Sequence, residues 1–100
     1  MISHRSRCLS FYAGALEWVL GPGLTTIAVA PMYHGAGFAF AYAALHTGGT
    51  VSMLRAFDPE AMLAQVAQHR ANSIFLVPTH AAMLKAIGED TIRQYDVSSL

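Results

Sequence analysis

The chain has 100 residues, 54% of them hydrophobic and only 12% charged, and its six basic and six acidic side chains cancel. This length allows at most one small domain, and the balanced charge argues against a nucleic-acid partner or an anionic membrane surface. The single cysteine excludes a disulfide framework. The longest apolar stretch, from Ala36 to Leu45, is too short for a transmembrane helix of about 20 residues. We therefore expect a cytoplasmic protein without a transmembrane segment.

The composition also predicts that these residues have apolar surface that something else must bury. An ordinary globular domain has about 45–50% apolar and about 25% charged residues. A small domain should be more polar than average, because its surface is large relative to its volume. This chain departs in the opposite direction. We expect that further chain or a partner covers much of its surface.

The first segment predicts a helix over residues 4–20, with Ser3 as its N-cap. Apolar side chains form two stripes along this helix, one through Leu9, Tyr12, Leu16 and Leu20 and the other through Cys8, Phe11, Ala15 and Trp18. A helix that is apolar on two faces is expected to be buried on two faces.

Strands and helices alternate along the rest of the chain. The clearest helix start is at Asp58, whose carboxylate suits an N-cap and which precedes a proline suited to the first helical position. Asn72 is expected to take the left-handed conformation at the end of that helix. The expected elements are a strand over 25–30, a helix from Gly35 or Gly37 to His46, a strand over 50–54, a helix from Pro59, a strand over 73–77, a helix capped by Thr79 and running to about Ile87, and an irregular segment over 89–100.

The order of these elements predicts the fold class. After the first helix the pattern is β-α-β-α-β-α, which favours an α/β fold with a three-stranded parallel sheet. The strands are continuous apolar runs, as is typical of strands covered on both faces. Three strands are too few for an independent doubly wound domain, so we expect a piece of a larger doubly covered sheet.

The most informative segment is Pro31-Met32-Tyr33-His34-Gly35-Ala36-Gly37-Phe38, which directly follows the first strand. Ligands bind at the carboxyl ends of strands in open α/β sheets, so His34, in a bend flanked by glycines, is a candidate ligand contact. The alternative is that His34 is hydrogen-bonded in a buried turn and holds the loop. Gly35 and Gly37 could equally serve close helix packing.

A second candidate segment, Val77-Pro78-Thr79-His80, occupies the same place on the third strand. If the first and third strands lie close together, Thr79 and His34 project from the same edge of the sheet. The alternative is that Thr79 only caps the following helix.

Several kinds of chemistry lack their sequence signals. No Gly-x-Ser-x-Gly nucleophile elbow is present. The five histidines and one cysteine show no metal-binding spacing. Neither G-x-G-x-x-G nor G-x-x-x-x-G-K-[ST] occurs, so the sequence predicts no phosphate-binding loop within these residues.

Five short motifs nevertheless occur in an order and at spacings that resemble one known family. The matching segments are Met1 to Arg5 with "GVMLSHRN", Pro31 to Gly37 with "PLFHxxG", Gly48 to Glu60 with "GATVVL…FDPE", Val77 to Thr79 with "VPT", and Tyr95 to Leu100 with "YDLSSLR". With these motifs the chain resembles the AMP-forming acyl-activating enzymes, which comprise acyl-CoA synthetases, luciferases and peptide adenylation domains. Each motif is weak alone, but together they are specific and cover essentially the whole chain.

The resemblance implies a two-step reaction. A carboxylate attacks the α-phosphate of ATP with Mg²⁺ assisting, which gives an acyl-adenylate and pyrophosphate, and a thiol, usually coenzyme A, then displaces AMP. The resemblance also implies that His34, Gly35, Gly37, Phe38 and Thr79 belong to an acyl pocket for a carboxylic acid. The small residues that follow His34 suggest room for a medium or long fatty acid.

Other motifs of the family have no match here. The phosphate loop, the Gly-Gly-Ala motif, the adenine- and Mg²⁺-binding motif, the ribose-binding aspartate and the C-terminal domain with its lysine are not found in residues 1–100. We therefore expect these residues to be part of the N-terminal domain of an AMP-forming fatty acid–CoA ligase. Alone the chain is expected to have no catalytic residue, to bind no ATP, Mg²⁺ or CoA, and to be poorly soluble or molten.

The remainder of the enzyme would then be the partner of this chain. The alternative is a non-catalytic α/β module that binds an acyl group or pairs with a complementary fragment. Binding of a fatty acid by the isolated 100 residues would favour the module.

Overall fold

The computed structural model describes residues 1–100 and confirms an α/β fold with a parallel sheet of three strands. The elements are α1 (His4–Glu17), β1 (Thr25–Ala28), α2 (Gly35–His46), β2 (Thr50–Met53), α3 (Pro59–His69), β3 (Ser73–Ile74), α4 (Pro78–Ile87) and α5 (Glu89–Ile92). The helix-strand alternation expected from the sequence is therefore present.

The sheet has the order β2-β1-β3, so β1 is its central strand. Both pairings are parallel, with Thr26 opposite Val51 on one side and opposite Ser73 on the other. Thr26 is 1% exposed, and its hydroxyl donates to the carbonyl oxygen of Ser73 at 3.0 Å. Because parallel strands need crossover connections, the helices between them cover the two faces of β1.

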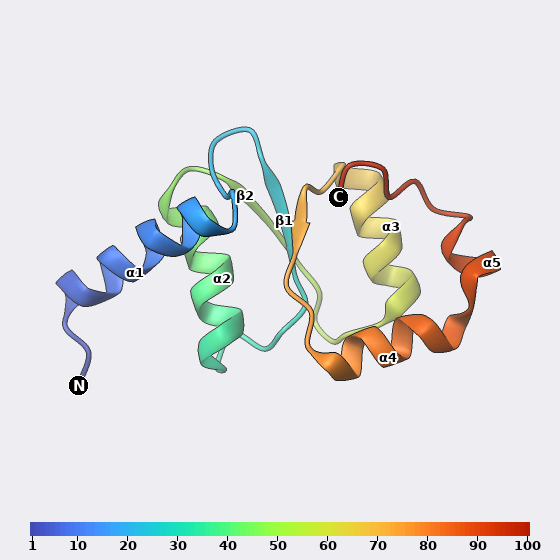
Figure 1. Ribbon diagram of the computed structural model, residues 1–100, viewed down its shortest axis with the longest axis horizontal. Coiled ribbons are helices and arrows are strands. Elements are labelled where there is room, and N and C mark those ends of the chain that lie inside the picture. The colour runs from blue at the N-terminus through green and yellow to red at the C-terminus, as the bar shows by residue number, and fades with distance from the viewer.

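The helices form two layers, one on each face of the sheet (Figure 1). One layer holds α1 and α2, whose shared core consists of Phe11, Ala15, Leu20, Phe40, Ala43 and Ala44. On the other face α3 packs on β1, and the core consists of Ile27, Val29, Met62, Leu63, Val66 and Ala71. Helices α4 and α5 lie on this second side, where Leu84, Ile87 and Ile92 pack against its core.

Three helices end in the same way, with a left-handed residue followed by a residue whose amide bonds back five positions. In α1, Val19 has φ 52° and the Leu20 amide donates to Ala15 at 2.8 Å. The same bond runs from Gly49 to Ala44 after Gly48 in α2, and from Ala71 to Val66 after Arg70 in α3. This Schellman arrangement satisfies a free carbonyl and, in α1 and α3, places an apolar residue against the helix it follows.

These helix ends correct two predictions. The first helix ends at Glu17 rather than at residue 20, because the turn at Val19 carries Leu20 into the core, where it is 7% exposed. The left-handed residue after α3 is Arg70 rather than Asn72. Asn72 instead pairs with the start of β1: its side-chain oxygen accepts from the Thr25 amide at 3.0 Å, and its own amide donates to the Thr25 carbonyl at 2.8 Å.

The C-terminal third differs from the prediction at three places. The third strand pairs only over Ser73–Ile74, opposite Thr26 and Ile27 of β1. Thr79 is not the cap of α4: the helix begins at Pro78, whose fixed φ suits the first position, and no side chain caps it. Within the segment expected to be irregular, Glu89–Ile92 forms one helical turn.

Polar contacts hold the last residues against α3. The Tyr95 hydroxyl donates to the Glu60 carboxylate at 3.3 Å, and burial together with that carboxylate raises the pKa of Tyr95. The side chain and amide of Ser98 both donate to Asp96 and lower the pKa of its carboxyl. The C-terminal segment thus packs back onto the helix that precedes β3.

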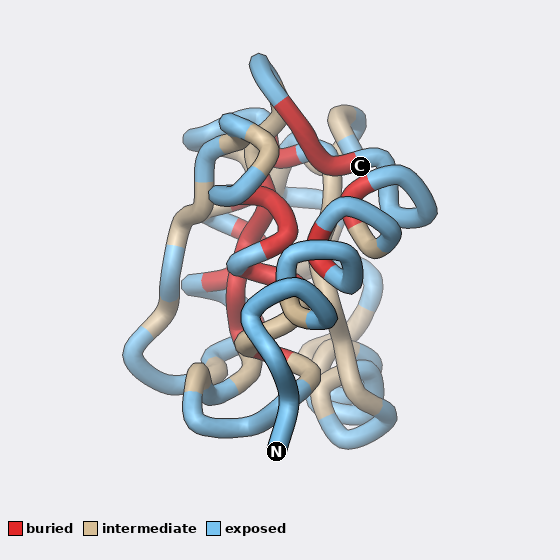
Figure 2. The backbone as a smooth tube through the Cα atoms, turned by 90° about the vertical axis from the view of Figure 1, so that its left-hand side faces the viewer, coloured by how far each residue is buried: buried red, intermediate tan, exposed pale blue.

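One face of α1 is uncovered, as the composition predicts. Leu9, Tyr12 and Leu16 are 59%, 52% and 82% exposed, whereas Phe11 and Ala15 on the other face are buried against α2. Figure 2 shows the N-terminal segment in the exposed colour while the buried segments lie in the interior. Only 18 of 100 residues are buried in a chain that is 54% hydrophobic, so much apolar surface remains accessible.

The left-handed Val19 provides a test of the helix end. A β-branched residue in the left-handed conformation destabilises the folded state by about 1–2 kcal/mol. A glycine avoids this strain, but its more flexible unfolded chain offsets roughly 0.4–1 kcal/mol of the gain. The Val19 side chain is 71% exposed and contributes little burial. We expect Val19→Gly to raise the free energy of opening of the last turn of α1 by about 0.5–1 kcal/mol. Hydrogen exchange of the Leu20 amide measures this.

The matched control is the equivalent position in α2. Gly48 has φ 84°, so Gly48→Ala places a side chain in the left-handed region and should lower protection of the Gly49 amide. Faster exchange at Leu20 in Val19→Gly would contradict the assignment of strain to Val19.

Candidate functional site

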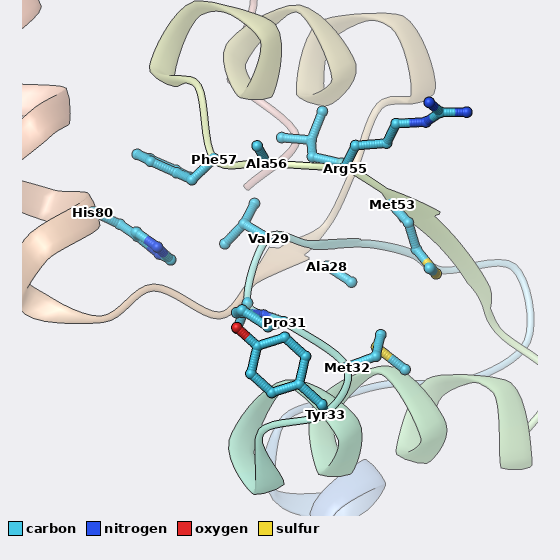
Figure 3. A pocket seen from close by; sticks show the side chains of 12 residues that line it. Ala28, Val29, Pro31, Met32, Tyr33, Met53, Arg55, Ala56, Phe57 and His80 are labelled. Atoms are coloured by element: carbon cyan, nitrogen blue, oxygen red, sulfur yellow. The ribbon is translucent and has the colours of Figure 1, made fainter.

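A pocket of about 450 Å³ opens at the carboxyl ends of β1 and β2 (Figure 3). It lies where the chain leaves these two neighbouring strands, and α4 closes one side. This is the position at which open α/β sheets bind ligands. The residues that line it are Ala28, Val29, Ala30, Pro31, Met32, Tyr33, Met53, Leu54, Arg55, Ala56, Phe57 and His80.

The interior of the pocket is apolar. Nine of its twelve residues are hydrophobic, and its only formally charged side chain is that of Arg55. Arg55 is exposed, and Figure 3 shows its guanidinium extending away from the pocket. Such a surface suits the hydrocarbon part of a ligand, because a carboxylate needs a cation or hydrogen-bond donors.

Two aromatic rings form the side of the pocket next to α4. The imidazole of His80 stacks on the ring of Phe57, with centroids 4.0 Å apart and planes at 16°. Phe57 also packs against the core on the α3 side of the sheet. The stacked pair therefore connects the segment after β2 to the first turn of α4 at the carboxyl edge of the sheet.

The loop from β1 to α2 is shaped by a close backbone approach. A Cβ at Gly37 would lie 2.7 Å from the Pro31 carbonyl oxygen and 2.8 Å from that of Ala30. The His34 amide donates to the Pro31 carbonyl at 3.0 Å, and His34 Nδ1 accepts from the Ala36 amide at 3.3 Å, which caps α2. The loop that carries five of the twelve lining residues is thus fixed by contacts with the first turn of α2.

None of the five residues expected in an acyl pocket lines this one. His34 and Gly35 are exposed at the start of α2, and Gly37 is buried against the loop backbone. Phe38 points to α1, with ring centroids 5.7 Å from Phe11 and the Arg7 guanidinium 5.2 Å from its own centroid. Thr79 is exposed in the first turn of α4.

Their immediate neighbours face the pocket instead. Tyr33 precedes His34 and His80 follows Thr79, and both belong to the lining. The two loops that carry the predicted residues thus both reach this pocket, and the assignment of those residues to an acyl pocket stays a prediction. The segment after β2, from Met53 to Phe57, was missed as well, although its place at a strand's carboxyl end was a usable signal.

No group of three His, Cys, Asp or Glu side chains lies close enough to hold a metal ion. The lining of the pocket contains no carboxylate, which a Mg²⁺ site with ATP requires. None of the helices combines the length and apolar character that crossing a membrane requires.

Comparison with known proteins extends over the whole chain. The family model of the AMP-binding enzymes matches residues 1–100. Luciferin 4-monooxygenase of Nipponoluciola cruciata is 33% identical over 81 residues, which are 81% of this chain and 14% of that protein. A medium/long-chain-fatty-acid–CoA/3-oxocholest-4-en-26-oate–CoA ligase of Mycolicibacterium smegmatis is 30% identical over 95 residues, 89% of this chain and 17% of that ligase.

Solved structures of similar sequence share the fold. A red-emitting luciferase from Phrixothrix hirtus superposes with a TM-score of 0.79 at 26% identity, covering 99% of this chain and 19% of that one. An amide bond synthetase from Marinactinospora thermotolerans gives 0.76 at 29% identity, covering 94% and 18%. The chain therefore spans less than one fifth of the length of these relatives.

The two glycines at the start of α2 test how the loop is held. Gly37→Ala forces the new methyl group against two backbone carbonyls and should destabilise the chain by about 1–3 kcal/mol. Gly35→Ala meets nothing within 4 Å and should be neutral or gain up to about 1 kcal/mol from helix propensity.

Trp18 fluorescence during urea unfolding reports both variants, since Trp18 packs on Phe40 of α2. Equal midpoints for Gly37→Ala and Gly35→Ala would show that the close approach does not hold the loop.

Proposed function

This chain belongs to the AMP-binding enzyme family, and we propose that it supplies the acyl-binding wall of an AMP-forming acid–thiol ligase. In the proposed reaction a carboxylate oxygen attacks the α-phosphorus of ATP and pyrophosphate leaves. The sulfur of a thiol such as coenzyme A then attacks the acyl carbon and AMP leaves. The part assigned to this chain is binding of the hydrocarbon portion of the acid.

The apolar pocket at the carboxyl ends of β1 and β2 supports this assignment most directly. Its interior contains no cation, so it suits an alkyl or ring system better than the reacting carboxylate. Two relatives are named CoA ligases, one for medium and long fatty acids and the other a 4-coumarate–CoA ligase-like protein. We propose a medium or long fatty acid as the substrate.

The five residues that the family resemblance suggests have different roles in this proposal. His34 caps α2 one residue beyond the pocket-lining Tyr33, at the rim where the acid would enter. Gly37 acts by fixing the loop, and Gly35 leaves open space beside His34. Phe38 and Thr79 flank the same two loops.

No three His, Cys, Asp or Glu side chains of this chain are grouped so that they could hold a metal ion. We propose that the remainder of the enzyme binds ATP, Mg²⁺ and the thiol and covers the exposed face of α1. Electrostatic stabilisation of the charge that develops at the α-phosphorus needs preorganised donors and a metal. The exposed, unpaired thiol of Cys8 agrees with the proposed reducing, cytoplasmic location.

A segment exchange tests the proposal. Residues 1–100 replace the matching segment of the Mycolicibacterium smegmatis ligase, and acyl-CoA formation is measured with acids of different chain length. We expect the ratio of kcat/KM values between acids to change while KM for ATP stays the same, because only the acyl wall differs. The unexchanged ligase is the control. A changed KM for ATP with an unchanged acid preference would contradict the proposal.

The alternative is a non-catalytic module that binds an acyl group by itself. The apolar lining of the pocket would also suit an acyl chain that is bound without ATP. Calorimetric titration of the isolated chain with decanoic acid separates the two. Micromolar, saturable binding in the absence of ATP supports the module, and its absence supports the ligase segment.

A further inference from the structure

One polar atom in the pocket lacks a hydrogen-bond partner. His80 belongs to the pocket lining, and its Nδ1 atom is buried without any donor or acceptor in reach. Buried polar side-chain atoms in proteins nearly always have a partner. Leaving one unpaired costs free energy that a ligand could recover on binding.

The imidazole cannot easily turn away to reach water. Its ring stacks on Phe57 at 4.0 Å and 16°, and Phe57 is itself packed against the core beneath α3. In Figure 3 the ring extends from the start of α4 toward Val29 and Pro31, the chain that leaves β1. Stacking on Phe57 and the direction of the ring place the imidazole in the wall of the pocket.

No other side chain of the pocket competes for this role. Arg55 is exposed and extends outward, and Tyr33 is 92% exposed at the rim. The remaining lining residues are apolar. A metal ligand is excluded as an explanation of the free atom, because no second or third ligand lies beside it.

We infer that His80 is a specificity residue that selects acids whose hydrocarbon part carries a hydroxyl group. This inference rests on the proposed function, since it assumes that the pocket receives the hydrocarbon part of an acid. A neutral imidazole presents Nδ1 either as an acceptor or as an N–H donor, according to its tautomer. A hydroxyl group pairs with both forms, whereas a keto oxygen pairs only with the N–H form and an alkyl chain with neither.

The test compares decanoic acid with hydroxydecanoic acids that differ in the position of the hydroxyl group. Binding to the full chain is followed by chemical-shift titration, which detects even millimolar affinity. At least one hydroxydecanoic acid should bind about five-fold more tightly than decanoic acid, the effect of one hydrogen bond to a buried group.

The variant His80→Phe keeps a ring on Phe57 but removes the nitrogen. We expect it to lose the preference for the hydroxylated acid over decanoic acid. His69→Phe, at the exposed end of α3, is the matched control and should keep the preference. A measurement that needs no variant is the ¹⁵N resonance of His80 Nδ1, which should move with the hydroxylated acid and not with decanoic acid.

Equal binding of all the acids, or a preference that survives in His80→Phe, would overturn this inference and leave the proposed function standing. If the chain binds none of the acids, the inference fails as well. The proposed function is then judged separately by the segment exchange, which does not depend on binding by the isolated chain.

Discussion

The burial of β1 from both sides is the constraint on which the rest of the structure depends. Ile27 at its centre is 0% exposed, with β2 and β3 along its edges and helices on its two faces. Each crossover helix has two roles. It returns the chain so that the next strand pairs in parallel, and it covers one face of β1. A strand that is buried on both faces needs cover on both sides, and the two layers of helices supply it.

The pocket is a consequence of the same arrangement. Beyond Ala28 and Met53 the central and edge strands leave the sheet, and their departing chains cannot fill the space between them. Gly37 lets α2 approach the backbone of the departing loop, and the stacked Phe57 and His80 close the side next to α4. The result is an apolar hollow whose wall contains one buried nitrogen without a hydrogen-bond partner.

Local signals made much of the fold predictable. The Asp58 carboxylate accepts from the Ala61 amide at 2.7 Å and Pro59 opens α3, as the residue types indicate. Ser3 caps α1 in the same way. These features depend on atoms within one helical turn, so the sequence predicts them without knowledge of the rest of the molecule. The ordered motifs likewise identified the family, which the match over residues 1–100 confirms.

By itself, then, the sequence determined the element types, the parallel sheet and the family, whereas the tertiary structure decided where helices end and which side chains face the pocket. Val19 and Arg70 are left-handed because the residue after each must reach the core, a requirement set by distant contacts. Tyr33 and His80 line the pocket rather than their neighbours, because the turn of each loop is fixed by packing against another element. Sequence spacing carries no information on that orientation, since it is a property of non-local packing.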